Sequence, residues 1–312
     1  MAFDHYLPAS YLGAFSRDTD PVRRKRQLWA VDKREGRLFQ TPASNLCGAQ
    51  NFYNLSRHSD QDPRFVDGSW SGYENNLNQA IDQMISGELE ALQWLKTLVV
   101  FAAALLVRGE DFNSRFAERL GPDLTASRGR DNTNMMRLME LQRLFASMIG
   151  ARWLLLETSG KVAQITNDLG YTPFLNPKLR ESGIAVPVGP KHILLIIATL
   201  KRVIAQVRNG SWIPNIEHGR LEDDAHHAFL MNIAACAQRF VIGPDEATMR
   251  PYLTSEPNPP PVPEPAMLGF LNGPMARRYE MIYFQILTKL ASPPGESDTN
   301  LYVDYVKNMT HD

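Results

Sequence analysis

The stretch IAVPVGPKHILLIIA (residues 184–198) decides which class of fold the sequence predicts. Pro187 and Pro190 exclude a helix interior before Lys191, because proline lacks the amide hydrogen that an interior helical residue donates. An extended chain is therefore predicted there. Beyond Lys191 the sequence leaves two alternatives open for residues 192–207, either a strand that runs into a helix or one buried helix, since so apolar a run shows no distinguishing period.

Short apolar runs that end at polar or glycine turns occur elsewhere in the chain. ARWLLLETSG (151–160) and KVAQITNDLG (161–170) have this pattern, which is typical of paired strands. QLWAVDKREGRLFQT (27–41) is typical of a hairpin, with its turn around Glu35 and Gly36. The sequence thus predicts a small, mostly antiparallel sheet.

Helical spacing of apolar residues covers more of the chain. It extends from Tyr73 to about Arg108, with a break at Ser86-Gly87. Further helices are predicted over 110–120, 132–149, 216–240 and 276–290. The fold class predicted is α+β, with a mainly helical layer packed on the small sheet. The apolar segment 91–108 contains Lys96, so we interpret it as a core helix and expect no membrane contact.

The chain is predicted to have three parts. Residues 1–250 form an α+β domain, 251–265 a proline-rich spacer, and 266–312 a C-terminal helix and tail. Six prolines between residues 257 and 265 favour an extended polyproline segment. This segment either only separates the parts or binds a protein partner of the SH3 type.

Composition limits the classes of function. The 312 residues are 44% hydrophobic and 21% charged with a net charge of −1, so a nucleic-acid site must be local. Two distant cysteines, Cys47 and Cys236, carry no metal or redox spacing and suit a reducing compartment. The first residues lack the basic and apolar regions of a signal peptide, and we expect a cytoplasmic protein.

The opening motif HYLPASYLGAF (5–15) presents the first candidate site residue. Pro8 favours an extended Leu7, and Tyr11 and Phe15 anchor the segment behind it. His5 is therefore held in place, either as a general base or metal ligand or as a histidine bonded to the backbone.

Three further residues complete a candidate catalytic set. Asp168 follows a strand in QITNDLGYTP, where it and Asn167 serve either a ligand site or an Asx-turn. Arg108 ends the apolar helix, as an anion clamp or as a partner of the helix C-terminus. Glu74 opens the helical region, as an acid or as a complement to a helix N-terminus. His5, Glu74, Arg108 and Asp168 together supply a base, two carboxylates and an anion clamp, and a divalent metal ion would suit them.

Two charged runs offer alternatives. HGRLEDDAHH (218–227) is either a zinc site or a solvated helix start, and no HExxH pattern supports the former. RRKRQLW is the basic run, in a segment of 40 residues with eight Lys and Arg against five Asp and Glu. Its predicted nucleic-acid contacts are Arg23, Arg24, Lys25, Arg26 and Trp29.

The order of several motifs resembles that in a known family. HYLPASYLGAF, LWAVDKREGRLF, NFY and YENNLNQAI are followed much later by ITNDLGYTP and IAVPVGPKHILLI. This order is similar to that of the bacterial family known as domain of unknown function four-two-three-eight, over about residues 3–240. The resemblance places the family's His-Tyr-Pro on His5, Tyr6 and Pro8, its helix glutamate on Glu74, its helix-ending arginine on Arg108 and its aspartate on Asp168. The family's Ser-Asp-x-Pro departs here to Asn167-Asp168 with a longer gap to Pro173.

These residues favour a hydrolase of a phosphate-containing substrate, a nuclease-like activity that would fit defence or toxin biology. The alternative is a non-catalytic module that binds nucleic acid or a protein.

Overall fold

The computed structural model describes residues 3–56, 61–110, 112, 130–176, 181–198, 203–253 and 279–302. Its strands are β1 (Phe3–His5), β2 (Gln27–Asp32), β3 (Arg37–Pro42), β4 (Gly48–Gln50), β5 (Arg152–Thr158), β6 (Thr166–Asn167), β7 (Thr172–Asn176), β8 (Glu181–Pro187), β9 (His192–Ile197), β10 (Val203–Arg208), β11 (Ser211–Pro214), β12 (Ile216–Leu221), β13 (Phe240–Gly243) and β14 (Asn300–Tyr302). Its longer helices are α2 (Phe65–Glu74), α3 (Leu77–Ser86), α5 (Val100–Arg108), α8 (Arg130–Ile149), α9 (Asp223–Cys236) and α12 (Tyr279–Leu290). Its short helical segments are α1 (Ala9–Leu12), η1 (Gly13–Phe15), η2 (Arg23–Lys25), η3 (Ala43–Asn45), α4 (Ala91–Gln93), η4 (Trp94–Val99), α10 (Glu246–Met249) and η5 (Arg250–Tyr252).

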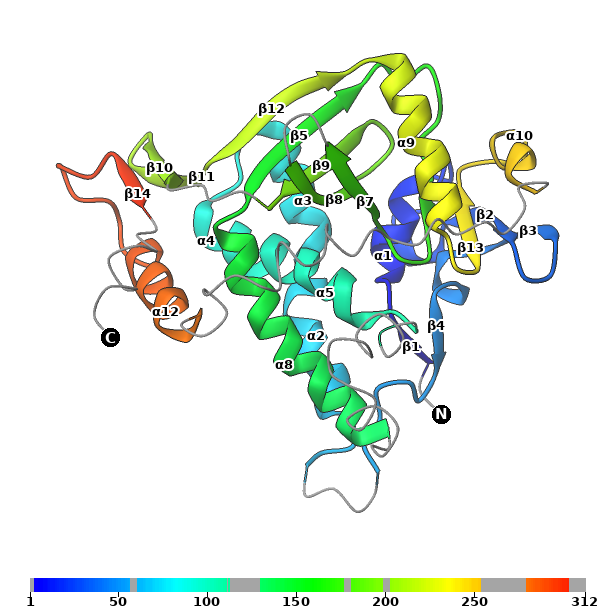
Figure 1. Cartoon of the computed structure of the whole chain (residues 1–312), viewed down its shortest axis with the longest axis horizontal. Coiled ribbons are helices and arrows are strands. Elements are labelled where there is room, and N and C mark those ends of the chain that lie inside the picture. Colours follow the sequence, from blue (N-terminus) through cyan, green and yellow to red (C-terminus); the bar gives the residue numbers. More distant parts are fainter. Residues whose placement is uncertain are drawn as a thin grey trace.

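A five-stranded sheet organises the fold (Figure 1). Its strand order is β12-β5-β9-β8-β7, in which β12 runs parallel to β5 and the other neighbours are antiparallel. The stretch 192–207, left open by the sequence, contributes strand β9 and most of strand β10. Strands that are buried on both faces show no alternation of apolar and polar residues, which explains the ambiguity.

Both faces of this sheet are covered. On one face, Trp153, Leu194 and Ile196 join the large core that α3, α5 and α8 also enter. On the other face, Ile193 and Leu195 belong to a second cluster with α9. In Figure 1 most helices lie below the sheet, while α9 stands beside β7 at its other side.

The predicted arrangement of one helical layer on a small sheet is therefore wrong, although the fold is α+β. In the described residues the strands form four sheets of two, three, five and four strands. Several helices cover one face of the five-stranded sheet, and α9 covers the other together with residues of the four-stranded sheet. The strands of the middle region carry apolar side chains on both faces, so they form one larger sheet that needs cover on both sides, whereas short strand pairs need cover on one side only.

The N-terminal hairpin is confirmed and belongs to a separate sheet. Strands β2 and β3 join β13 and β6 in the order β3-β2-β13-β6, which is antiparallel throughout. The opening segment connects this region to the central sheet, because the Tyr11 hydroxyl donates to the Pro187 carbonyl at 2.7 Å. Strand β1 pairs with β4.

The apolar segment 91–108 forms one continuous helix, which consists of α4, the π-helical η4 and α5. It is the only helix in the described ranges that is long and apolar enough to cross a membrane, and 78% of it is buried inside the protein. Its side chains fill the large core, as a core helix requires.

The C-terminal elements gather around a three-stranded sheet, at the left of Figure 1. Strand β14 pairs with β10, which also pairs with β11, and α12 packs against α8. The division at residues 250 and 265 stays a prediction. The proline segment 257–265 and the helix predicted over 110–120, apart from residues 110 and 112, lie outside the described residues.

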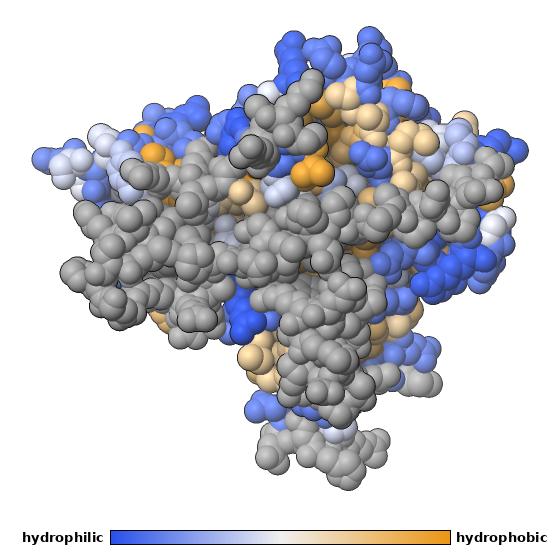
Figure 2. All heavy atoms as spheres, viewed as in Figure 1, coloured by the Kyte–Doolittle hydropathy of each residue, from blue (hydrophilic) through white to orange (hydrophobic). Residues whose placement is uncertain are grey.

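On the face shown in Figure 2, the coloured residues are mostly hydrophilic, with apolar colour near α9. Met231 on α9 and Leu175 on the nearby strand β7 are about half exposed.

Candidate functional site

Arg108 is the centre of a buried polar cluster. It is 2% exposed, and its guanidinium lies 5.0 Å from the centre of the Trp70 ring. Its Nε donates to the Tyr53 hydroxyl at 3.2 Å, and one terminal nitrogen donates to the Tyr73 hydroxyl at 2.5 Å and pairs with Glu74. The other terminal nitrogen donates to the His5 carbonyl. Every nitrogen of this guanidinium therefore has a partner inside the protein.

The cluster holds Arg108 in its charged form. Burial alone would lower its pKa, but the oxygens of Tyr73, Tyr53 and Glu74 raise the pKa well above the usual value. The sequence placed Glu74 at the start of a helix. It is instead the last residue of α2, where it pairs with Arg108.

His5 and Asp168 also bond to main chain. The His5 Nε2 lies 2.9 Å from the Ser44 carbonyl oxygen. Asp168 is 5% exposed, and its carboxylate accepts from the amides of Gln238 at 3.0 Å and Arg239 at 2.7 Å. The structure thus joins His5, Glu74 and Arg108 in one chain of contacts, while these two Asp168 bonds go to the segment after α9. Catalysis by the four residues stays a prediction.

The basic run has two different kinds of residue. Arg23 donates to Asn78 and pairs with Asp82 at 2.9 Å, and Arg26 donates to the Asp20 carbonyl. Arg24 and Lys25 are exposed on η2, and Trp29 is half-buried on β2.

The acidic and histidine run divides between two elements. His218 belongs to strand β12, whereas His226 is buried on α9 with its Nε2 2.9 Å from the Gln164 amide oxygen. Asp223 pairs with Lys161 at 2.7 Å. In the described ranges no group of three or more His, Cys, Asp or Glu side chains is placed to hold a metal ion.

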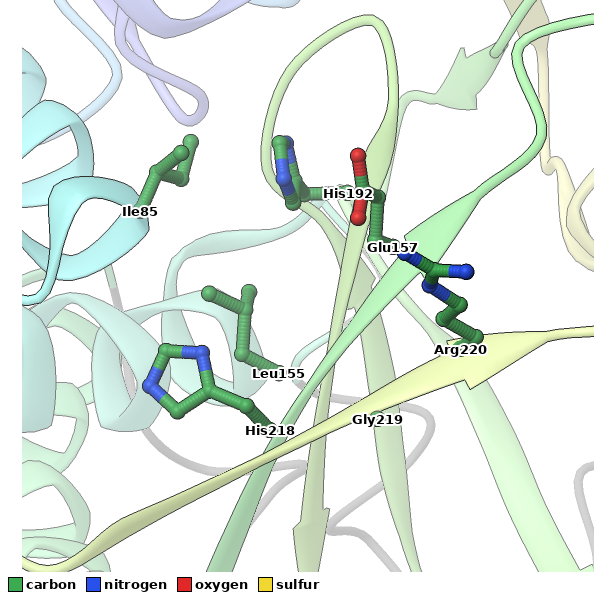
Figure 3. A pocket seen from close by; sticks show the side chains of 7 residues that line it. All are labelled: Ile85, Leu155, Glu157, His192, His218, Gly219 and Arg220. Atoms are coloured by element: carbon green, nitrogen blue, oxygen red, sulfur yellow. The ribbon is translucent and has the colours of Figure 1, made fainter.

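A groove lies where the C-terminal ends of β5 and β12 meet the start of β9 (Figure 3). Its volume is about 510 Å³. The residues that line it are Ile85, Leu155, Glu157, His192, His218, Gly219 and Arg220.

Strand register explains this set. Glu157 on β5 is paired with His192 on β9 and with Arg220 on β12, so the three stand in one row across the sheet. Leu155 and His218 form the next row, two residues earlier, and point to the same side. Figure 3 shows the two imidazoles, the carboxylate and the guanidinium around Leu155.

The polar side chains of this groove are available to a ligand. Glu157, His218 and Arg220 are exposed. Within the described part of the chain, no hydrogen bond or ion pair involves their side chains or that of His192. Burial lowers the pKa of His192, and the carboxylate of Glu157 partly opposes this. His192 is therefore mainly neutral at pH 7, as a base requires.

The comparison with known families covers the part of the chain that contains all the motifs quoted above. Residues 4–247 match the family described as protein of unknown function (DUF4238). The chain belongs to the DUF4238 family. The resemblance seen in the sequence is thus confirmed. No curated protein and no solved structure is detectably similar to the chain.

The matched region of this DUF4238 member contains the Arg108 cluster and the whole groove. Sequence reasoning missed the groove because it predicted helix over 216–240, whereas Ile216–Leu221 is a strand and only Asp223–Cys236 is α9. The alternation of large polar side chains at His218 and Arg220 with Gly219 between them is the sequence feature that indicates a strand here. A strand is usually recognised by apolar residues at every second position, on its buried side. The edge strand β12 has charged and polar residues at several of its positions, so this alternation is weak.

Proposed function

We propose that the groove binds a phosphate ester and hydrolyses it. One observation carries this proposal: two imidazoles, a guanidinium and a carboxylate surround one hollow and have no hydrogen-bonding partner in the described part of the protein. Imidazoles transfer protons near neutral pH, and a guanidinium binds phosphate oxygens in bidentate fashion. This combination supplies a proton acceptor, a proton donor and a phosphate-binding cation, the groups that acid–base catalysis of phosphoryl transfer uses.

Each side chain has a role in this scheme. Neutral His192 takes a proton from the water that attacks phosphorus, and Glu157 beside it stabilises the resulting imidazolium. The new bond joins the water oxygen to phosphorus. As the bond to the leaving oxygen breaks, His218 donates a proton to that oxygen. Arg220 neutralises the charge on the remaining phosphate oxygens.

The substrate class that we favour within phosphate esters is a nucleic acid, which makes the activity nuclease-like. A role in bacterial defence or toxin biology, in the cytoplasm, would fit this activity. Both cysteines are free and buried, in keeping with a reducing compartment.

The proposal is tested by phosphodiester hydrolysis, with bis(p-nitrophenyl) phosphate and labelled RNA and DNA as substrates. We expect H192A, H218A and R220A each to lower kcat/KM by about 100-fold or more. The control is H227A, an exposed histidine on α9 outside the groove. Full activity in all three groove variants, or none in the wild type, would overturn the proposal.

A second candidate, a nucleic-acid-binding module, rests on Arg24 and Lys25, which are exposed side by side on η2. If they contact phosphates, R24A/K25A weakens binding of single-stranded oligonucleotides and flattens its salt dependence. Unchanged binding would remove this candidate. A protein partner for residues 257–265 stays a prediction.

A further inference from the structure

The groove continues into a second cavity of about 390 Å³. Glu157 and Arg220 line both cavities. The second cavity is further lined by Thr158, Ser159, Lys161, Leu221, Glu222 and Asp223. A ligand whose phosphoryl group is held at Arg220 therefore has room to extend in this direction.

The charges of the second cavity differ from those of the first. It adds the carboxylates of Glu222 and Asp223 against the single cation Lys161. The ammonium group of Lys161 is already paired with Asp223 at 2.7 Å. A second phosphate would be repelled at this end, so the ligand group that enters it is neutral or cationic.

The side chain of Thr158 indicates which kind of ligand group fits the second cavity. It is 4% exposed and lines the second cavity, and within the described residues its hydroxyl has no hydrogen-bond partner. A buried hydroxyl without a partner is unfavourable until a ligand supplies one. Among the described residues the Glu222 side chain likewise has no hydrogen bond or ion pair. A hydroxyl and a carboxylate that line one cavity offer acceptors to a ligand rich in donors, and carboxylates bind ribose hydroxyls in this way.

We infer that the two cavities together accept a ribonucleotide, with its phosphoryl group at His192, His218 and Arg220 and its ribose hydroxyls at Glu222 and Thr158. This inference rests on the proposed function and names the ligand of the same groove. In this arrangement the second cavity, with Glu222, selects the sugar, and the first, with Arg220 and the two histidines, binds the phosphate.

The test compares the dissociation constants of uridine 5′-monophosphate and 2′-deoxyuridine 5′-monophosphate by calorimetry. The wild type is expected to bind the ribonucleotide about 10-fold or more tightly than the deoxyribonucleotide, as one lost hydrogen bond to a carboxylate implies. E222Q and T158V should bring the ratio close to one. D224N is the matched control, because Asp224 is a neighbouring exposed carboxylate that lines neither cavity, and it should keep the wild-type ratio.

The possible failures are distinguishable. Equal binding of the two nucleotides by the wild type overturns the inference, while loss of both in R220A leaves the proposed function standing. A ratio that E222Q and T158V leave unchanged also overturns the inference. Binding of neither nucleotide, together with no hydrolysis of any phosphodiester, removes the inference and the proposed function alike.

Discussion

At the scale of single residues, Arg108 shows how a charge can be buried in this fold. Its guanidinium is surrounded by the rings of Tyr53, Trp70 and Tyr73, and it bonds to Glu74 and the His5 carbonyl. These contacts join the end of α5 to α2 and to the first strand. The opening motif is therefore anchored by a buried cation as well as by its own aromatic side chains.

Replacing Arg108 tests this role. Arg108→Met leaves the Glu74 carboxylate, two phenols and a main-chain carbonyl without their donor, so we expect the free energy of unfolding to fall by about 3–5 kcal/mol. Chemical denaturation followed by circular dichroism measures it. The control is Arg64→Met, which breaks the exposed pair with Asp67 and should cost at most about 1 kcal/mol. Equal effects of the two substitutions would show that the cluster adds no special stability.

At the scale of elements, the loop between β6 and β7 is fixed by Asn167. Its side-chain oxygen accepts from the amides of Leu169 at 3.1 Å and Gly170 at 2.9 Å, and its side-chain nitrogen donates to the Tyr171 carbonyl. Gly170 has φ of +74°, and a Cβ there would lie 2.8 Å from Leu7 and 2.9 Å from Leu105. The Asx-turn that the sequence allows at Asn167 and Asp168 is thus present, and Asn167 forms it.

Two glycine substitutions separate backbone strain from crowding in this loop. Gly210 has the same φ of +74°, with nothing within 4 Å of a Cβ. Gly210→Ala should therefore cost only the strain of the left-handed backbone, about 1–2 kcal/mol. Gly170→Ala should cost about 1–3 kcal/mol more, because Leu7 and Leu105 must move within the core. Thermal and chemical unfolding of both variants measure the difference, and a difference near zero would contradict the close packing.

At the scale of the whole molecule, the buried His226 and the half-buried His192 make stability depend on pH. Burial lowers the pKa values of His226 and His192 in the folded protein. The unfolded chain then binds more protons just below pH 6.5, so the free energy of unfolding falls as pH falls through this window. Each histidine adds a slope of at most about 1.4 kcal/mol per pH unit.

The contribution of His226 to the pH dependence of the free energy of unfolding can be measured separately from that of the other titrating groups. In chemical denaturation between pH 7.5 and 5, His226→Gln should flatten the slope, because the titrating group is removed. His227→Gln, on the exposed side of α9, should leave the slope unchanged. An equal slope in both histidine variants would show that His226 does not titrate in this window.

Asp18 and Asp298 have lowered pKa values because of hydrogen bonds, so their stabilising effect is lost only at more acidic pH, below about 3.8.

Local sequence patterns predicted several elements correctly. The hairpin of β2 and β3 has its turn at Gly36, and the break after Ser86 has Gly87 in the left-handed conformation. The apolar segment 91–108 is a core helix. In these cases the deciding interactions lie within a few residues of each other, so a short window of sequence contains them.

The sequence by itself determined the α+β class, the hairpin, the core helix and, through its motifs, membership of the DUF4238 family. Only the tertiary structure decided that the central sheet is covered on both faces and that Glu157, His192, His218 and Arg220 share one groove. The physical reason is strand register. It aligns side chains from positions 157, 192 and 220 through hydrogen bonds between distant segments, and no local periodicity encodes that alignment.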